Sequence, residues 1–197
     1  MARPADFSVI GNESPGSWVR TFGSAMNGST VFAGEDFDNS LHGLMARFPQ
    51  AGRLDWIGLR PRSRVVMLTV QAAEASRDRG LVGDRHLLRG GGGKRQVTLI
   101  QAEHIVAVAH MVGRDNINPG ILRRNLVVSG VNLLALKDHQ FRIGAAAFRF
   151  TGLCHPCSRM EEALGRGGYN AMRGHGGITA AVIAEGTIRV GDSVEVG

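Results

Sequence analysis

Cysteine, lysine and aromatic residues are scarce in this sequence. Its 197 residues include 2 Cys, 1 Tyr and 2 Trp, and its lysines are Lys94 and Lys137. Two cysteines are too few for a disulfide framework, so we expect a protein of the reducing cytoplasm. With 6% aromatic residues, few side chains could stack on the bases of a single-stranded nucleic acid.

Long apolar runs are missing as well. No stretch reaches the length needed to span a membrane, and residues 1–11 lack the apolar region of a secretion signal. The net charge is +6, but the arginines are dispersed and form no block of like charge. We therefore expect neither a membrane nor a nucleic acid as partner. The positive charge indicates either a compositional bias toward arginine or a positively charged pocket entrance for a phosphorylated small molecule.

Glycine is abundant, with 28 residues. This frequency is typical of β-rich proteins with many tight turns and bulges. Residues 1–40 are rich in Gly, Ser, Asn and Pro without apolar periodicity, which predicts an N-terminal extension, partly disordered. Residues 41–197 contain short strand-like runs at regular spacing. They predict a single mostly β domain, a closed or partly closed β-barrel with a few short helices.

Three element predictions can be checked directly. Residues 101–112 have apolar side chains at helical spacing and are followed by Gly113, which predicts a helix with a glycine cap. Residues 64–73 and 133–136 are rich in aliphatic side chains, and we predict a strand in each.

Both cysteines lie in the motif Cys154-His155-Pro156-Cys157, between a strand-like run and a helical one. A zinc site is excluded because it needs four ligands and no second ligand pair follows. A dithiol redox pair and a single functional thiol remain. Arg159 and the start of the helix favour the thiolate form of Cys157. Cys154 ends an apolar strand and is expected to be buried, so we interpret Cys157 as the reactive residue.

Other polar motifs could bind an anion. The loop Gly83-Asp84-Arg85-His86 could supply a metal or acid–base pair, or simply a hydrogen-bonded turn. Arg123-Arg124-Asn125 could clamp a phosphate or a carboxylate, or lie exposed at the surface. Arg173 and His175 lie among glycines that would let backbone N–H groups approach a ligand.

Together these motifs resemble the MOSC domain, which is the C-terminal domain of molybdenum cofactor sulfurases and also occurs as small stand-alone bacterial proteins. The resemblance covers about residues 41–197. Its segments, in order, are residues 80–86, 123–127, 141–144, 154–161, 172–177 and 188–192.

The resemblance implies a barrel-like fold and a molybdenum cofactor (molybdopterin) as ligand. It also implies a functional cysteine in a Pro-Cys-x-Arg setting, matched by Cys157 and Arg159. In related proteins this cysteine is thought to carry sulfur as a persulfide or to ligate molybdenum, so Cys157 is also the expected metal ligand. The expected cofactor-binding residues are Asp84, Arg85, His86, Arg123, Arg124, Asn125, Arg159, Arg173 and His175. Pyridoxal phosphate is associated with the family through fused desulfurase domains. The chain has no room for such a domain, so we do not expect this cofactor.

We therefore expect a MOSC protein that binds a small anionic ligand, a molybdenum-pterin cofactor, next to one reactive cysteine. A sulfur-donor or electron-donor protein is the expected partner. Alternatives are a molybdenum-dependent reductase of N-hydroxylated compounds, a non-catalytic binding module, or a thiol–disulfide protein that uses the CxxC spacing of Cys154 and Cys157.

Overall fold

The computed structural model describes residues 39–87 and 93–197. The N-terminal extension predicted for residues 1–40 therefore lies almost entirely outside the described residues. In chain order the elements are α1 Leu41–Met45, β1 Gly52–Leu59, β2 Leu68–Val70, β3 Ala72–Ser76, β4 Gly80–Leu81, β5 Val97–Gln101, α2 Ala102–Met111, α3 Pro119–Leu122, β6 Leu126–Ser129, the 3-10 helix η2 Leu133–Leu136, β7 Gln140–Ile143, β8 Ala146–Leu153, α4 Ser158–Leu164, α5 Gly168–Ala171, β9 Ile178–Ala184, β10 Gly186–Arg189 and β11 Ser193–Val196.

Seven strands form a closed barrel. Their order is β1-β11-β7-β8-β9-β5-β6, and β6 pairs again with β1. The prediction of a mostly β barrel with short helices is thus confirmed. Every pair in this ring is antiparallel except β5 with β6. A parallel pair cannot be joined by a tight turn, and the connection between these two strands carries α2 and α3.

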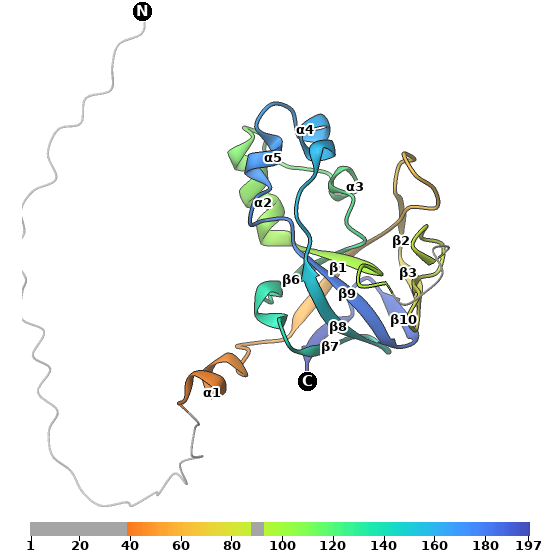
Figure 1. Ribbon diagram of the computed structural model, residues 1–197, viewed down its shortest axis with the longest axis vertical. Coiled ribbons are helices and arrows are strands. Elements are labelled where there is room, and N and C mark those ends of the chain that lie inside the picture. The colour runs from red at the N-terminus through yellow and green to blue at the C-terminus, as the bar shows by residue number, and fades with distance from the viewer. Residues whose placement is uncertain (1–38, 88–92) are drawn as a thin grey trace, which may run out of the picture. The chain divides into compact units, whose positions relative to one another are not determined.

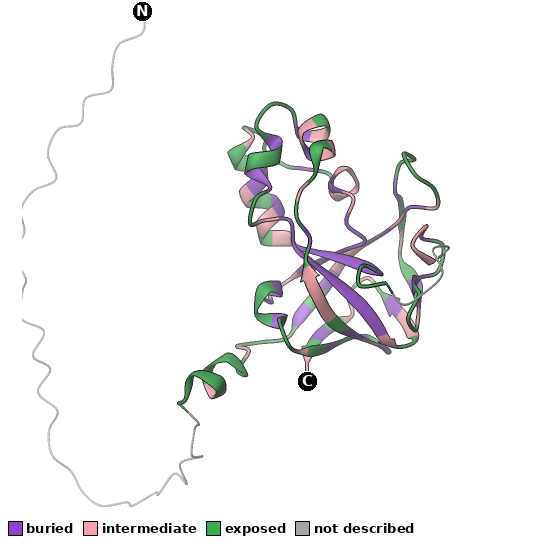
Figure 2. Cartoon of the chain, in the orientation of Figure 1, coloured by how far each residue is buried: buried purple, intermediate pink, exposed green. Residues whose placement is uncertain are grey.

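Two clusters of buried apolar residues share the barrel wall. Figure 2 shows buried residues both along the strands of the barrel and in the helices. Side chains alternate between the two faces of a strand. In β6, Leu126 and Val128 therefore point into the barrel core, while Val127 packs with the helices on the other side. Phe141 and Phe148 stack inside the barrel with ring centroids 5.6 Å apart. The outer core fixes the helices against the barrel, so their ends become part of a rigid frame.

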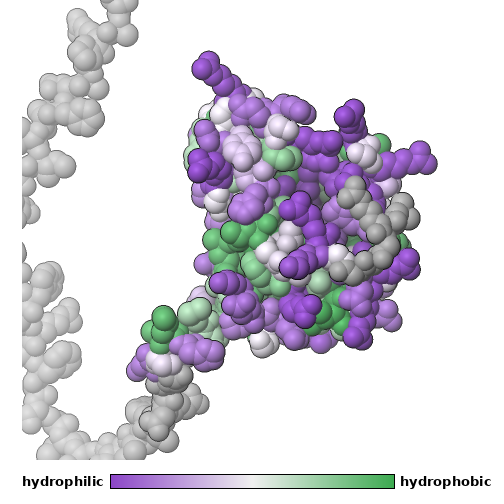
Figure 3. All heavy atoms as spheres, viewed as in Figure 1, coloured by the Kyte–Doolittle hydropathy of each residue, from purple (hydrophilic) through white to green (hydrophobic). Residues whose placement is uncertain are grey.

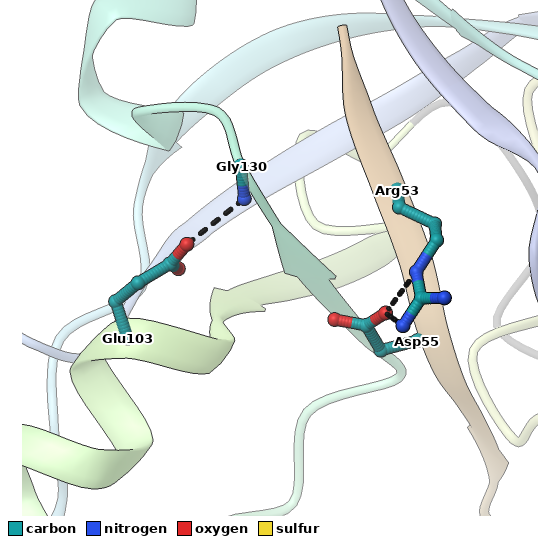
Figure 4. A network of polar contacts seen from close by, with 4 residues as sticks. All are labelled: Arg53, Asp55, Glu103 and Gly130. Atoms are coloured by element: carbon teal, nitrogen blue, oxygen red, sulfur yellow. Dashed lines mark hydrogen bonds and ion pairs between the residues drawn. The ribbon is translucent and has the colours of Figure 1, made fainter.

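The helices α2 to α5 gather at one end of the barrel, away from the C-terminus (Figure 1). The predicted helix at residues 101–112 is confirmed as α2. Its first turn is tied to the barrel because Glu103 Oε1 accepts a hydrogen bond of 2.9 Å from the backbone N–H of Gly130 (Figure 4). The same view shows the ion pair of Arg53 with Asp55 on β1, at 2.7 Å. This helical end of the barrel holds the candidate site.

Two strand predictions were wrong. Residues 64–67 are not in a strand, which begins only at Leu68, and Ala72 already belongs to a different sheet. Residues 133–136 form η2, because Asn132 Oδ1 accepts from the backbone N–H of Leu134 and caps a helical turn. Leu133 and Leu136, three residues apart, both reach the barrel core from this turn. Burial in a tertiary core, and not strand pairing, accounts for the aliphatic content.

Three apolar side chains of α1, those of Leu41, Leu44 and Met45, are exposed. Figure 3 shows hydrophobic surface on this helix and on other parts of the domain. This helix has no buried residue, and its N-terminus is capped by Ser40, which accepts from the backbone N–H of Gly43. None of the helices in the described part of the chain is long and apolar enough to cross a membrane.

Candidate functional site

A pocket of about 400 Å³ opens at the helical end of the barrel. We call it the arginine pocket, because six arginines of the described part of the chain line it: Arg60, Arg85, Arg95, Arg123, Arg124 and Arg159. His86 and His155 add two imidazoles, and no carboxylate is among the described residues that line it. Cations clustered in a lining without a described carboxylate produce a positive cavity, which favours an anionic ligand.

Strand pairing brings these arginines together. Arg60 follows the last residue of β1, whereas Arg123 and Arg124 precede the first residue of β6. Because β1 and β6 are antiparallel, the end of one lies beside the start of the other. The start of β5 joins them through its parallel pairing with β6, and Thr98 of β5 lines the pocket. The pocket is therefore built on one rim of the barrel.

Asp84 and Asn125 hold this rim together from inside. Asp84 is only 2% exposed. Its carboxylate accepts hydrogen bonds of 2.9 Å from the backbone N–H groups of Arg60 and His86 and from Nδ2 of Asn125. Asn125 also donates to the Gly58 carbonyl, and its Oδ1 accepts from Thr98. Both side chains are thus satisfied within the protein, and they position the pocket without lining it.

Arg124 holds in place the turn after β8 that contains Cys154. Its buried guanidinium donates to the carbonyls of Gly176 and Leu122, both at 2.8 Å, and of Cys154 at 3.2 Å. A Cβ at Gly176 would lie 2.1 Å from the Cys154 carbonyl oxygen, so only glycine permits this close approach. Burial is the main cause that lowers the pKa of Arg124. Three nitrogen atoms of its guanidinium donate to backbone carbonyls. Arg124 therefore holds the backbone in place, and the other arginines of the pocket remain to bind a ligand.

Several cationic groups in the pocket have hydrogen-bond donors without partners. Arg60 is 6% exposed, yet its Nε has no hydrogen-bond partner among the described residues, and Nε of Arg85 is also unpaired. Burial, followed by repulsion from Arg123 and Arg85, lowers the pKa of Arg60 to about 10, against the attraction of Asp84. Buried polar groups are normally paired, because leaving them unpaired costs free energy. These donors would be satisfied by an anion in the pocket.

The two cysteines differ in exposure, and the predicted burial of Cys154 is confirmed. Both are free thiols, with Cys154 buried and Cys157 exposed. The backbone N–H of Cys154 donates to the Gly177 carbonyl at 2.8 Å, which fixes the turn just after β8. Cys157 occupies the cap position before α4 and lines the pocket. Burial and Arg159 lower the pKa of Arg123, whereas Cys157 acts in the opposite direction, so thiol and guanidinium share one electrostatic environment.

The structure separates the predicted site residues into three groups. Arg85, His86, Arg123, Arg124, Cys157 and Arg159 line the pocket. Asp84 and Asn125 lie behind it. Arg173 and His175 do not line it: Arg173 is exposed, and the ring of His175 contacts that of His104 edge-on, with centroids 4.8 Å apart.

Sequence reasoning missed Arg60 and Arg95. Arg60 stands between a predicted strand and Pro61, and an arginine just past a strand end was the available signal. No cluster of three or more His, Cys, Asp or Glu side chains that could hold a metal ion occurs in residues 39–87 and 93–197. The predicted metal ligand Cys157 therefore has no companion set of this kind, and further ligands would come from the bound group itself.

Comparison with known proteins agrees with this architecture. The MOSC domain family model matches residues 83–195. Among curated proteins, none matches the chain. The YuaD protein of Bacillus subtilis is similar in structure, with a TM-score of 0.65 and 20% identity over 75% of this chain and 96% of that one. YiiM of Escherichia coli has a TM-score of 0.59 and 19% identity over 76% of this chain and 70% of its own. YiiM of Geobacillus stearothermophilus has a TM-score of 0.57 and 18% identity, over 74% and 75%. At these identities the likeness concerns the fold.

Proposed function

Because the chain belongs to the MOSC domain family, we propose that the arginine pocket binds a molybdenum-pterin cofactor. Cys157 at its edge would act as a sulfur carrier or as a ligand of the metal. One observation carries the proposal: among the described residues, six arginines and no carboxylate line a cavity that opens beside an exposed thiol.

The residues present fit such a cofactor. Guanidinium groups bind the oxygen pairs of a phosphate through parallel N–H donors, and Arg60, Arg85 and Arg123 are among the arginines that line the pocket. A thiolate is a soft ligand of the kind that suits transition metals with sulfur coordination. When bound, the cofactor would supply a metal centre for oxygen or sulfur exchange. The protein would bind the phosphate and keep Cys157 at the pocket edge, while Asp84 and Asn125 hold the rim.

As a sulfur carrier, Cys157 would accept sulfur from the persulfide of a donor protein. Its thiolate would attack the outer sulfur, so that a new S–S bond forms on Sγ while the donor's S–S bond breaks and the donor thiolate leaves. No net oxidation occurs in this exchange. Arg123 and Arg159, which line the pocket with Cys157, would stabilise the negative charge of the attacking sulfur.

The unequal burial of the two cysteines favours this single-thiol chemistry over a dithiol pair. Both cysteines line the pocket, but Cys154 is buried and Cys157 is exposed, so a donor protein would meet the Cys157 thiol first. A reductase of N-hydroxylated compounds would use the same pocket with a separate electron-donor protein. We keep the cytoplasm as the proposed location and propose no nucleic-acid partner.

The test is chemical analysis of the full chain purified from a molybdenum-replete host. We expect molybdenum bound in proportion to protein, or a persulfide on the peptide that contains Cys157. Cys157→Ser should lose whichever is found, while the matched variant Cys154→Ser should keep it. Absence of both molybdenum and persulfide from the native chain would contradict the proposal.

A further inference from the structure

A second cavity adjoins the arginine pocket. It has a volume of about 770 Å³, and Arg123 and Arg159 line both cavities. Its walls come from the loop before β2, from α3 and from α4. We call it the apolar groove. Because the two cavities share two arginines, a molecule in the groove would lie beside the ligand of the arginine pocket.

The lining of the groove has two chemical halves. One half is apolar and consists of Val65, Val66, Met67, Ile121 and Ala163. Val65 is 42% exposed, Val66 86% and Leu68 55%, so neighbouring aliphatic side chains are exposed together at this loop. The other half carries Arg64, Arg123 and Arg159, with Glu162 as the single acidic residue among the described residues of the lining. The groove therefore combines an apolar surface with a net positive end.

The apolar floor is preformed. Met67 is buried at the start of β2, and β2 pairs with β1 from Leu59↔Leu68 to Ile57↔Val70. The indole Nε1 of Trp56 donates to Thr69 Oγ1 at 3.2 Å, which ties the same two strands by their side chains. A site held in this way binds a ligand without first having to order its own floor.

We propose that the apolar groove binds a small organic anion with an apolar body, such as an aryl or alkyl carboxylate. The charged end would lie against Arg123 and Arg159, and the apolar body against Val65, Val66 and Ile121. The volume lies within the range of about 300–1,000 Å³ that is typical of small-molecule sites. The role of this ligand, as the substrate presented to the group held at Cys157, rests on the proposed function. Its binding does not require the cofactor.

The test uses a fluorescent probe, 8-anilinonaphthalene-1-sulfonate, which is an apolar anion, with N-phenyl-1-naphthylamine as its neutral counterpart. Two variants change the groove from different elements: Val66→Asp adds a repelling charge on the loop, and Ala163→Phe fills space from α4. The control is Val106→Asp. Val106 is 55% exposed on α2, outside the groove. Thermal unfolding of each variant checks that the fold is retained.

We expect the anionic probe to bind saturably to the native chain, and its affinity to fall about tenfold in Val66→Asp and in Ala163→Phe. The neutral probe should bind to the native chain about tenfold more weakly than the anionic probe does. The control should bind within about twofold of the native chain. Unchanged binding in both groove variants, or equal binding of the two probes, would overturn the proposal. Titration with pyrophosphate, measured separately, reports on the arginine pocket. If the native chain does not bind pyrophosphate, the proposed function is contradicted. The result for the apolar groove does not depend on that outcome.

Discussion

Arg60 offers the sharpest test of the reasoning, because its charge is buried and incompletely paired in the free protein. The substitution Arg60→Met keeps a long side chain of similar reach and removes the charge. The pKa of Arg60 is lowered to about 10, mainly by burial. At about 1.4 kcal/mol per pKa unit, this corresponds to an unfavourable free energy of about 3 kcal/mol for the charged form in the folded state. This figure already includes the attraction of Asp84. Screening by solvent at the pocket reduces the stability that is gained when the charge is removed.

We therefore expect Arg60→Met to be more stable than the native chain by about 1–2 kcal/mol in the absence of ligand. For a domain of this size that corresponds to a rise in Tm of about 2–8 °C. Anion binding should change in the opposite direction. An anion that binds only the folded state raises its stability by RT ln(1 + [L]/Kd), so pyrophosphate should raise the Tm of the native chain much more than that of the variant.

The assay is thermal unfolding of both proteins with and without pyrophosphate. Arg149→Met serves as the control, because Arg149 is exposed on β8 and does not line the arginine pocket. Its stability and its response to pyrophosphate should stay close to those of the native chain. If Arg60→Met is destabilised and keeps the full gain from pyrophosphate, Arg60 is a structural residue and the reasoning fails.

Four further predictions concern the two cysteines, Gly176, His104 and residues 1–40. Alkylation at neutral pH, followed by mass spectrometry, should label Cys157 well before Cys154; equal rates would support the dithiol alternative. Gly176→Ala should destabilise the fold by roughly 2–4 kcal/mol in chemical unfolding, because its Cβ would lie 2.1 Å from the Cys154 carbonyl oxygen; a neutral effect would mean that the turn can shift freely. Burial and then His175 lower the pKa of His104, against the opposing effect of Glu103. The unfolded state should thus take up a proton first as pH falls below about 6.5, so stability should decrease in that range and decrease less in His104→Gln; parallel stability–pH curves would contradict this. Removal of residues 1–40 should leave a folded domain by circular dichroism and thermal unfolding, and an insoluble or molten product would show that these residues belong to the core.

Local patterns were sufficient for the fold class and for part of the site. The helical spacing at residues 101–112 predicted α2, because its buried positions Ile105, Val108 and Ala109 recur on one face. The position of Cys154 at the end of an apolar strand predicted its burial. Each of these inferences depends on residues close together in the sequence, where spacing alone determines which side chains share a face.

The composition of the arginine pocket was decided by the tertiary structure. Arg60 and Arg123 are far apart in the chain, and only the antiparallel pairing of β1 with β6 places them in one cavity. Asp84 and Asn125 looked like ligand contacts in the sequence, yet closure of the barrel buries them and commits their atoms to hydrogen bonds within the rim. The sequence by itself thus determined a β-rich domain in which Cys154 is buried. Strand register determined which cations face the ligand, because pairing partners depend on long-range packing that no local pattern encodes.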